Sequence, residues 1–167
     1  MSAIYKCCAS LGLLILTIAG CSRASAGVEK NLLTASGTVT LDGKPVKGAL
    51  VTFTPTGTNT QSHQGSGVTD SDGNFEMFNY QNQQGLPPGE YVATFSIWLM
   101  PDGSAPPAGQ PPATSRAVQA IPPLWTDVSK AGLHNKVTVS DSGNSDFLFQ
   151  ISKDATGGSA SPRVFMR

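Results

Sequence analysis

The chain has 167 residues, a formal net charge of zero, 39% hydrophobic residues and only 13% charged residues. This length is enough for one domain with its own hydrophobic core, and the lack of a basic patch argues against nucleic acid as a partner. Few charges, together with 18 glycines and 12 prolines, favour short strands joined by turns over a bundle of helices.

The first 20 residues have the features of a secretory signal peptide. A single charged residue, Lys6, precedes an uncharged apolar run at residues 11–19. This run is shorter than the roughly 20 residues that cross a bilayer, and its length is typical of a signal-peptide core. The alternatives are an ordinary secretory signal without lipid attachment and an N-terminal anchor helix that stays on the protein.

Cys21 directly follows the small residues Ala19 and Gly20. This arrangement resembles the lipobox of bacterial lipoproteins. The resemblance implies that the Cys21 thiol receives a diacylglycerol, that the chain is cut just before Cys21, and that the new amino group is acylated. All three cysteines lie within the first 21 residues, so the mature domain is expected to contain no disulfide or thiolate metal site.

Four regions are expected along the chain. Residues 1–20 form the signal peptide, 21–34 the lipidated N-terminus and a tether, 35–153 the folded domain, and 154–167 a tail without a clear pattern. The expected location is the cell envelope, outside the cytoplasm, with the lipid as the membrane partner. Ser22 stands where some bacteria use aspartate to retain lipoproteins at the inner membrane, which favours the outer membrane.

Alternating polar and apolar residues predict the strands of the domain in chain order. Strands are expected at residues 36–41, 49–54, 75–78, 90–98, 134–140 and 145–151, with a further short segment at 67–69. Turn residues at 42–43, 72–73 and 86–89 separate them, because glycine and proline fix tight turns. Loops are expected at 56–66 and 79–85, a proline-rich structureless excursion at 101–116, and a loop or single helical turn at 126–132. About seven short strands predict an antiparallel β-sandwich.

The order of these motifs resembles the carboxypeptidase regulatory-like domains. The matching segments are residues 37–46, 48–53, 69–75 and 86–92, while residues 121–125 and the strand around 137–139 resemble small lipoproteins of the planctomycete type that carry this domain. The resemblance covers about residues 35–151. It implies an all-β, seven-stranded antiparallel transthyretin-like (prealbumin-like) β-sandwich. The motifs themselves are turn-forming sequences, which instruct folding and not catalysis.

Several residues that could carry chemistry fit a structural role better. Asp70, Asp72, Asn74 and Glu76 alternate as in a calcium loop, but the glycine and the twelfth-position acid of that loop are misplaced, so a turn is favoured. His63 and His134 have no neighbours at metal-ligand spacing. The segment at 65–67 does not form a nucleophile elbow. One transthyretin-like branch hydrolyses hydroxyisourate, but its C-terminal Tyr-Arg-Gly-Ser tail is absent here. No cofactor or metal is expected.

Two tryptophans, Trp98 and Trp125, are the candidate residues for stacking on a ligand such as a sugar ring. The alternative is that Trp98 belongs to the core and Trp125 caps an edge. The expected function is that of a non-catalytic lipoprotein with a structural or binding role at the envelope, where an envelope protein or a glycan could be its partner. The alternatives are a carbohydrate-binding module and an accessory domain of an extracytoplasmic enzyme.

Overall fold

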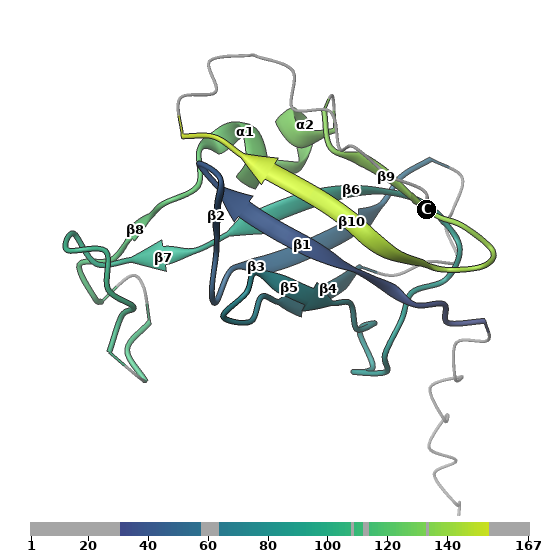
Figure 1. The fold of residues 1–167 in the computed structure, drawn as a ribbon, viewed down its shortest axis with the longest axis horizontal. Helices are drawn as coiled ribbons and strands as arrows, with labels where there is room; N and C mark the ends of the chain where they lie inside the picture. The colour runs from purple at the N-terminus through teal and green to yellow at the C-terminus, as the bar shows by residue number, and fades with distance from the viewer. Residues whose placement is uncertain (1–30, 58–63, 108, 112–113, 133, 154–167) are drawn as a thin grey trace, which may run out of the picture.

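Ten β-strands and two single-turn helices occupy the part of the chain that the structure describes (Figure 1). The structure is a computed structural model, and it describes residues 31–57, 64–107, 109–111, 114–132 and 134–153. The predicted signal peptide, Cys21, most of the tether, His63 and the predicted tail at 154–167 lie outside the described residues.

The first sheet is centred on the N-terminal strand of the domain. Its strands are β10 (Asn144–Ile151), β1 (Ala35–Leu41) and β2 (Lys44–Pro45) in that order, with β5 (Asn74–Glu76) also paired to β1. The predicted tight turn at Asp42 and Gly43 joins β1 to β2, and both residues have positive φ, at 51° and 77°. A backbone of this kind favours glycine and tolerates aspartate, which explains why these two residue types mark the turn.

The second sheet is antiparallel throughout. Its strands, in order, are β4 (Gly65–Val68), β3 (Leu50–Pro55), β6 (Gly89–Ser96) and β9 (Lys136–Val139). Successive side chains point to opposite faces, so Val51 and Phe53 are buried while Leu50 on the same strand is exposed. This alternation is the pattern that predicted the strand from the sequence.

The two sheets share one core of aromatic and aliphatic side chains. Phe53 of the second sheet lies at its centre, with its ring centroid 5.5 Å from that of Phe147 and 6.2 Å from that of Phe149, both on β10. Phe75 of β5 also contacts it at 6.3 Å. Aromatic contacts between the sheets therefore show that the inner faces pack against each other, and the predicted all-β architecture is confirmed.

One strand pairing departs from the antiparallel arrangement that the sequence predicted. β10 runs parallel to β1, with Thr38 opposite Leu148 and Leu41 opposite Ile151. The reason is that β9 and β10 are consecutive in the chain but belong to different sheets. The turn at residues 140–143 carries the chain from one sheet to the other, so β10 begins at the same end of the domain as β1.

The predicted loop at residues 56–66 is wrong at its C-terminal end, because β4 begins at Gly65. The inward positions of β4 are the glycines Gly65 and Gly67. A Cβ atom on Gly67 would lie 2.2 Å from the Glu76 carbonyl oxygen, and one on Gly65 would lie 2.9 Å from the Phe78 carbonyl oxygen. The edges of the two sheets therefore meet backbone to backbone, and only glycine fits there.

A two-stranded ribbon and two short helices follow β6. The ribbon is β7 (Trp98–Leu99) with β8 (Val118–Gln119), and the helices are α1 (Pro123–Thr126) and α2 (Val128–Ala131). The single strand predicted over 90–98 is thus two elements, since β6 ends at Ser96. The helical turn that the sequence allowed at 126–132 is present as α2, while α1 begins earlier, where Pro122 and Pro123 fix the backbone for a helical start.

The ribbon and the start of β1 lie at opposite ends of the sandwich (Figure 1). We call the end where β1 begins the tether end. There Leu33 exchanges two backbone hydrogen bonds with Leu86, each 2.9 Å long, and Asn144 donates one of 2.7 Å to Thr34. We call the other end, which holds the turn at Asp42 and Gly43 and the β7–β8 ribbon, the far end. The chain is thus fixed to the domain from Leu33 onward.

Candidate functional site

Trp98 lies on the β7–β8 ribbon at the far end, and its side chain is 42% exposed. The ribbon is fastened at its base by Gln119, which pairs with Trp98 across the two strands. The Gln119 side-chain oxygen accepts hydrogen bonds from the backbone N–H of Ile97 (2.9 Å) and Ile121 (3.2 Å), and its amide donates to Ser96 Oγ (2.7 Å). The Trp98 ring is therefore accessible, and the ribbon that carries it is held in place by the hydrogen bonds of Gln119.

Gln119 is a positioning residue that sequence reasoning missed. It stands at the end of a proline-rich segment, where no periodic pattern marks it. Its side-chain oxygen accepts a hydrogen bond from the backbone N–H of Ile97, between β6 and β7, where no strand partner does so. The residues that it joins lie more than 20 positions away in the chain. No local feature of the sequence carries that information.

Trp125, the second candidate for ligand stacking, is buried and only 2% exposed. Its ring lies with its centroid 6.0 Å from that of Phe95, in an edge-to-face arrangement. The sequence-based assignment of Trp125 as a stacking residue therefore does not fit the structure, because neither face of its ring is open to a ligand. Its burial follows from α1, which turns residues 123–126 toward the core beside β6.

Two buried side chains near β6 have polar atoms without a hydrogen-bond partner among the described residues. They are Trp125, through Nε1, and Asn135, through both side-chain polar atoms. The Asn135 backbone is satisfied, since its carbonyl accepts from Ala93 and its N–H donates to Ala131. Unpaired buried polar groups are destabilising, so these side-chain atoms reduce the stability of the fold.

The alternating acidic segment at residues 70–76 forms the predicted turn. One Asp70 carboxylate oxygen accepts hydrogen bonds of 2.9 Å from the backbone N–H groups of Asn74 and Asp72. These bonds, that from Asn74 first, lower the pKa of Asp70 below its usual value. The Asp70 carboxylate therefore stabilises the turn in which it lies.

Among the described residues no group of three or more His, Cys, Asp or Glu side chains could hold a metal ion, and His134 is exposed.

Two further aspartates brace turns in the same way. Asp102 accepts from the hydroxyl and backbone N–H of Ser104, and these bonds lower the pKa of Asp102. Asp127 accepts from the hydroxyl and backbone N–H of Ser129 at the start of α2, which lowers the pKa of Asp127. Both carboxyl groups are exposed; Asp127 is the N-cap of α2, whereas Asp102 stabilises the turn after β7.

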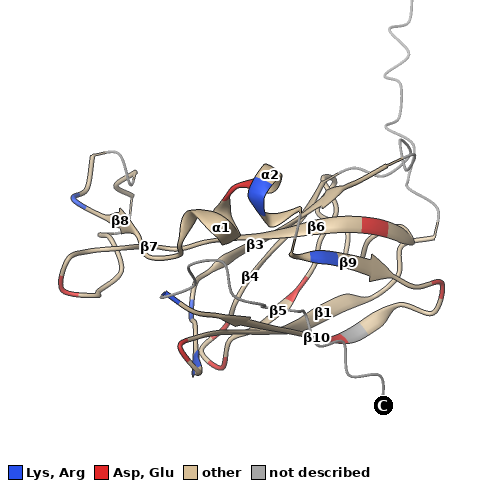
Figure 2. Cartoon of the chain, turned by 90° about the horizontal axis from the view of Figure 1, so that it is seen from above, with Lys and Arg blue, Asp and Glu red and all other residues tan. Residues whose placement is uncertain are grey.

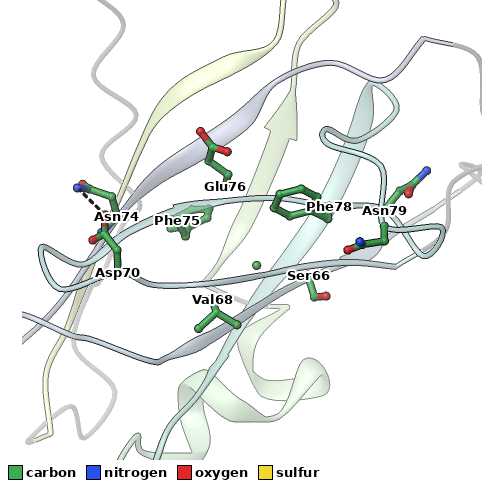
Figure 3. A pocket seen from close by; sticks show the side chains of 10 residues that line it. Ser66, Val68, Asp70, Asn74, Phe75, Glu76, Phe78 and Asn79 are labelled. Carbon is green, nitrogen blue, oxygen red and sulfur yellow. Dashed lines mark hydrogen bonds between the residues drawn. The ribbon is translucent and has the colours of Figure 1, made fainter.

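A hollow of about 550 Å³ lies beside β4 and β5, where the edges of the two sheets meet (Figure 3). Figure 3 shows Glu76 on one side of this edge and Ser66 and Val68 on the other. The Glu76 carboxylate accepts a hydrogen bond of 3.0 Å from Gln84. No histidine is among the described residues that line the hollow.

Comparisons with family models, with curated proteins and with solved structures gave no match to this chain. Its function is therefore inferred from its sequence motifs and from the geometry of the described residues. Within those residues, no helix has the length and apolar character needed to cross a membrane.

Proposed function

We propose that this protein is a lipid-anchored module of the cell envelope whose non-catalytic domain binds a partner or ligand. Its domain would be a transthyretin-like sandwich of the carboxypeptidase regulatory-like kind, as the order of its turn motifs suggests. The membrane partner would be the bilayer that takes the lipid on Cys21. Several acyl chains on one residue hold a protein far more firmly than one, because each buried CH₂ contributes about 0.8 kcal/mol.

The observation that carries this proposal is the placement of the two ends of the domain. The chain that leads back to Cys21 joins the domain at the tether end, while the braced ribbon with Trp98 projects at the far end (Figure 1). The stretch from Cys21 to Leu33 spans at most about 40 Å when fully extended. An anchor at Cys21 would therefore hold the domain near the membrane and leave the far end free to face outward.

Lipid attachment has a direct test in cells grown with radiolabelled palmitate. The wild-type chain is expected to take up label, and the Cys21→Ser variant is expected to take up none, because the acceptor thiol is gone. Cys8→Ser is the matched control, since it also replaces a cysteine near the N-terminus but leaves Cys21 in place. Label in Cys21→Ser at the wild-type level would contradict the proposal.

A second candidate function, glycan binding, is favoured by the exposure of Trp98. An indole ring held on a braced ribbon can cover the apolar face of a sugar. On a glycan array, Trp98→Ala is expected to weaken any binding at least tenfold, because covering such a ring contributes about 1.5 kcal/mol or more. Tyr80→Ala is the control, as Tyr80 is an exposed aromatic residue in the loop after β5. Equal binding by Trp98→Ala and the wild type would rule out this role for Trp98.

A further inference from the structure

A second hollow, of about 380 Å³, opens at the far end on a surface that none of the roles above uses. Its volume lies within the range of about 300–1,000 Å³ that is usual for small-molecule sites. The end of β1, the chain around β2, the junction of β6 and β7, and the residues after β10 converge on it. Its lining residues are Leu41, Asp42, Lys44, Pro45, Val46, Lys47, Ile97, Leu99, Gly103 and Lys153.

The inner wall of this hollow is apolar. Ile97 and Val46 are 7% and 8% exposed, and Leu41 and Leu99 are half-buried against the core. Ile97 and Leu99 alternate with Trp98 along the chain, so they point away from the face of the ribbon that carries the tryptophan. The hollow and Trp98 are consequently two separate surfaces of the far end.

The rim of the hollow is basic. It carries three lysines, Lys44, Lys47 and Lys153, against one acid, Asp42. These are half of the cationic side chains in the described part of the chain, which are Lys44, Lys47, Arg116, Lys130, Lys136 and Lys153. Figure 2 shows blue segments, with red ones beside them, at the end of the domain that carries the β7–β8 ribbon. Asp70 and Asp72 are not among the residues that line the hollow.

The three ammonium groups have no carboxylate within 4.0 Å among the described residues. The Asp42 carboxylate accepts a hydrogen bond of 3.0 Å from the backbone N–H of Lys153, and it keeps its negative charge. The Asp70 carboxylate accepts hydrogen bonds within its own turn and is not among the residues that line the hollow. The lining therefore carries three positive charges against the one negative charge of Asp42, with no salt bridge among the described residues, and this excess of positive charge would attract anions.

We propose that this hollow binds a small organic anion with an apolar body, such as a carboxylate, a sulfonate, a sulfate ester or a phosphate ester. The lysines would hold the anionic group at the rim, and the apolar wall would cover the body. This site would supply a ligand class for the proposed binding role, but it needs neither the lipid on Cys21 nor Trp98. Its success or failure can therefore be separated from theirs.

The test is lysine acetylation of the full chain, held in vesicles of neutral phosphatidylcholine and analysed residue by residue by mass spectrometry. Naphthalene-2-sulfonate is the probe, with 2-naphthol as the uncharged analogue and inorganic sulfate as the anion without an apolar body. The sulfonate is expected to slow acetylation of Lys44, Lys47 and Lys153 at least fivefold. Lys130 and Lys136, which are exposed elsewhere, are expected to react at unchanged rates.

Variants decide whether the protection comes from the assembled site. Lys44→Gln with Lys153→Gln removes two charges and is expected to abolish protection of Lys47, whereas Lys130→Gln is expected to leave it intact. The same protection in Cys21→Ser would show that the site is independent of the anchor, as proposed. Equal protection by 2-naphthol or by inorganic sulfate, or protection that extends equally to Lys130 and Lys136, would overturn the proposal.

Discussion

Replacing Trp125 with alanine is expected to lower the free energy of unfolding by about 3–5 kcal/mol. The side chain is 2% exposed and packs edge-to-face on Phe95. It fills the side of the sandwich where β9 no longer pairs with β6, because that pairing ends at Val92 and Lys136. Removing the indole would leave a cavity between the sheets at a place where no strand can close it. Chemical unfolding followed by circular dichroism measures the effect.

Trp98→Ala is the matched control, because it removes the same side chain from an exposed position. Its expected cost is less than about 1 kcal/mol. Trp125→Phe keeps an aromatic ring but removes Nε1, which has no hydrogen-bond partner among the described residues. Phenylalanine should therefore retain more than half of the stability that alanine loses. Equal losses in Trp98→Ala and Trp125→Ala would show that Trp125 is not the core residue that the structure indicates.

The Phe53→Ala variant is expected to lose a similar amount, about 3–5 kcal/mol, from the centre of the core. The ring is fully buried and joins the two sheets through aromatic contacts. Its ring partners are Phe75, Tyr91, Phe147 and Phe149. The alanine cavity would face four large rings that cannot collapse into it without leaving their own strands.

Leu50→Ala on the same strand is the control for this second variant. Leu50 points to the outer face and is 42% exposed, so its loss is expected to cost about 0.5 kcal/mol. Both variants are measured by the same unfolding experiment. A Phe53→Ala domain as stable as Leu50→Ala would mean that the sheets are not joined through this ring.

The sequence predicted those strands whose one face is apolar and whose other face is polar. In β3, β9 and β10 the inward residues alternate with polar ones, and the strands lie within a few residues of their predicted positions. The turns were predictable because Asp42 and Gly43 occupy backbone conformations that few other residues tolerate. In these regions the local residue pattern and the tertiary fold favour the same backbone conformation, so the strand or turn can be predicted from the sequence.

The start of β4, at Gly65 and Ser66, was predicted as a loop because the inward residues of this strand have no side chains to show a pattern. Gly65 and Gly67 alternate with Ser66 and Val68, so no side chain projects from the inner face of the strand. Glycine in such a position indicates close approach of another backbone, here that of residues 76–78. Hydrophobic periodicity cannot detect this kind of strand, since the contact that buries it depends on a partner distant in the chain.

The two tryptophans show a second limit of local reasoning. Trp98 and Trp125 follow similar apolar residues in the sequence, yet one is exposed on the ribbon and the other is buried. Their burial is decided by the route of the chain between them, through the proline-rich excursion and α1. The lysine hollow was also invisible in the sequence, because Lys153 lies more than 100 positions from Lys44 and Lys47. Parallel pairing of β1 with β10 brings these segments together.

That parallel pairing also determines how the domain would respond to mechanical tension. β1 starts and β10 starts at the same end, so a pull on the N-terminal end of β1 against the C-terminal end of β10 acts along the strands in opposite directions. The hydrogen bonds from Ala35 to Leu41 would then be loaded together, in shear, instead of opening one after another. A protein fixed by its N-terminus and pulled through β10 would resist with all the hydrogen bonds between β1 and β10 at once.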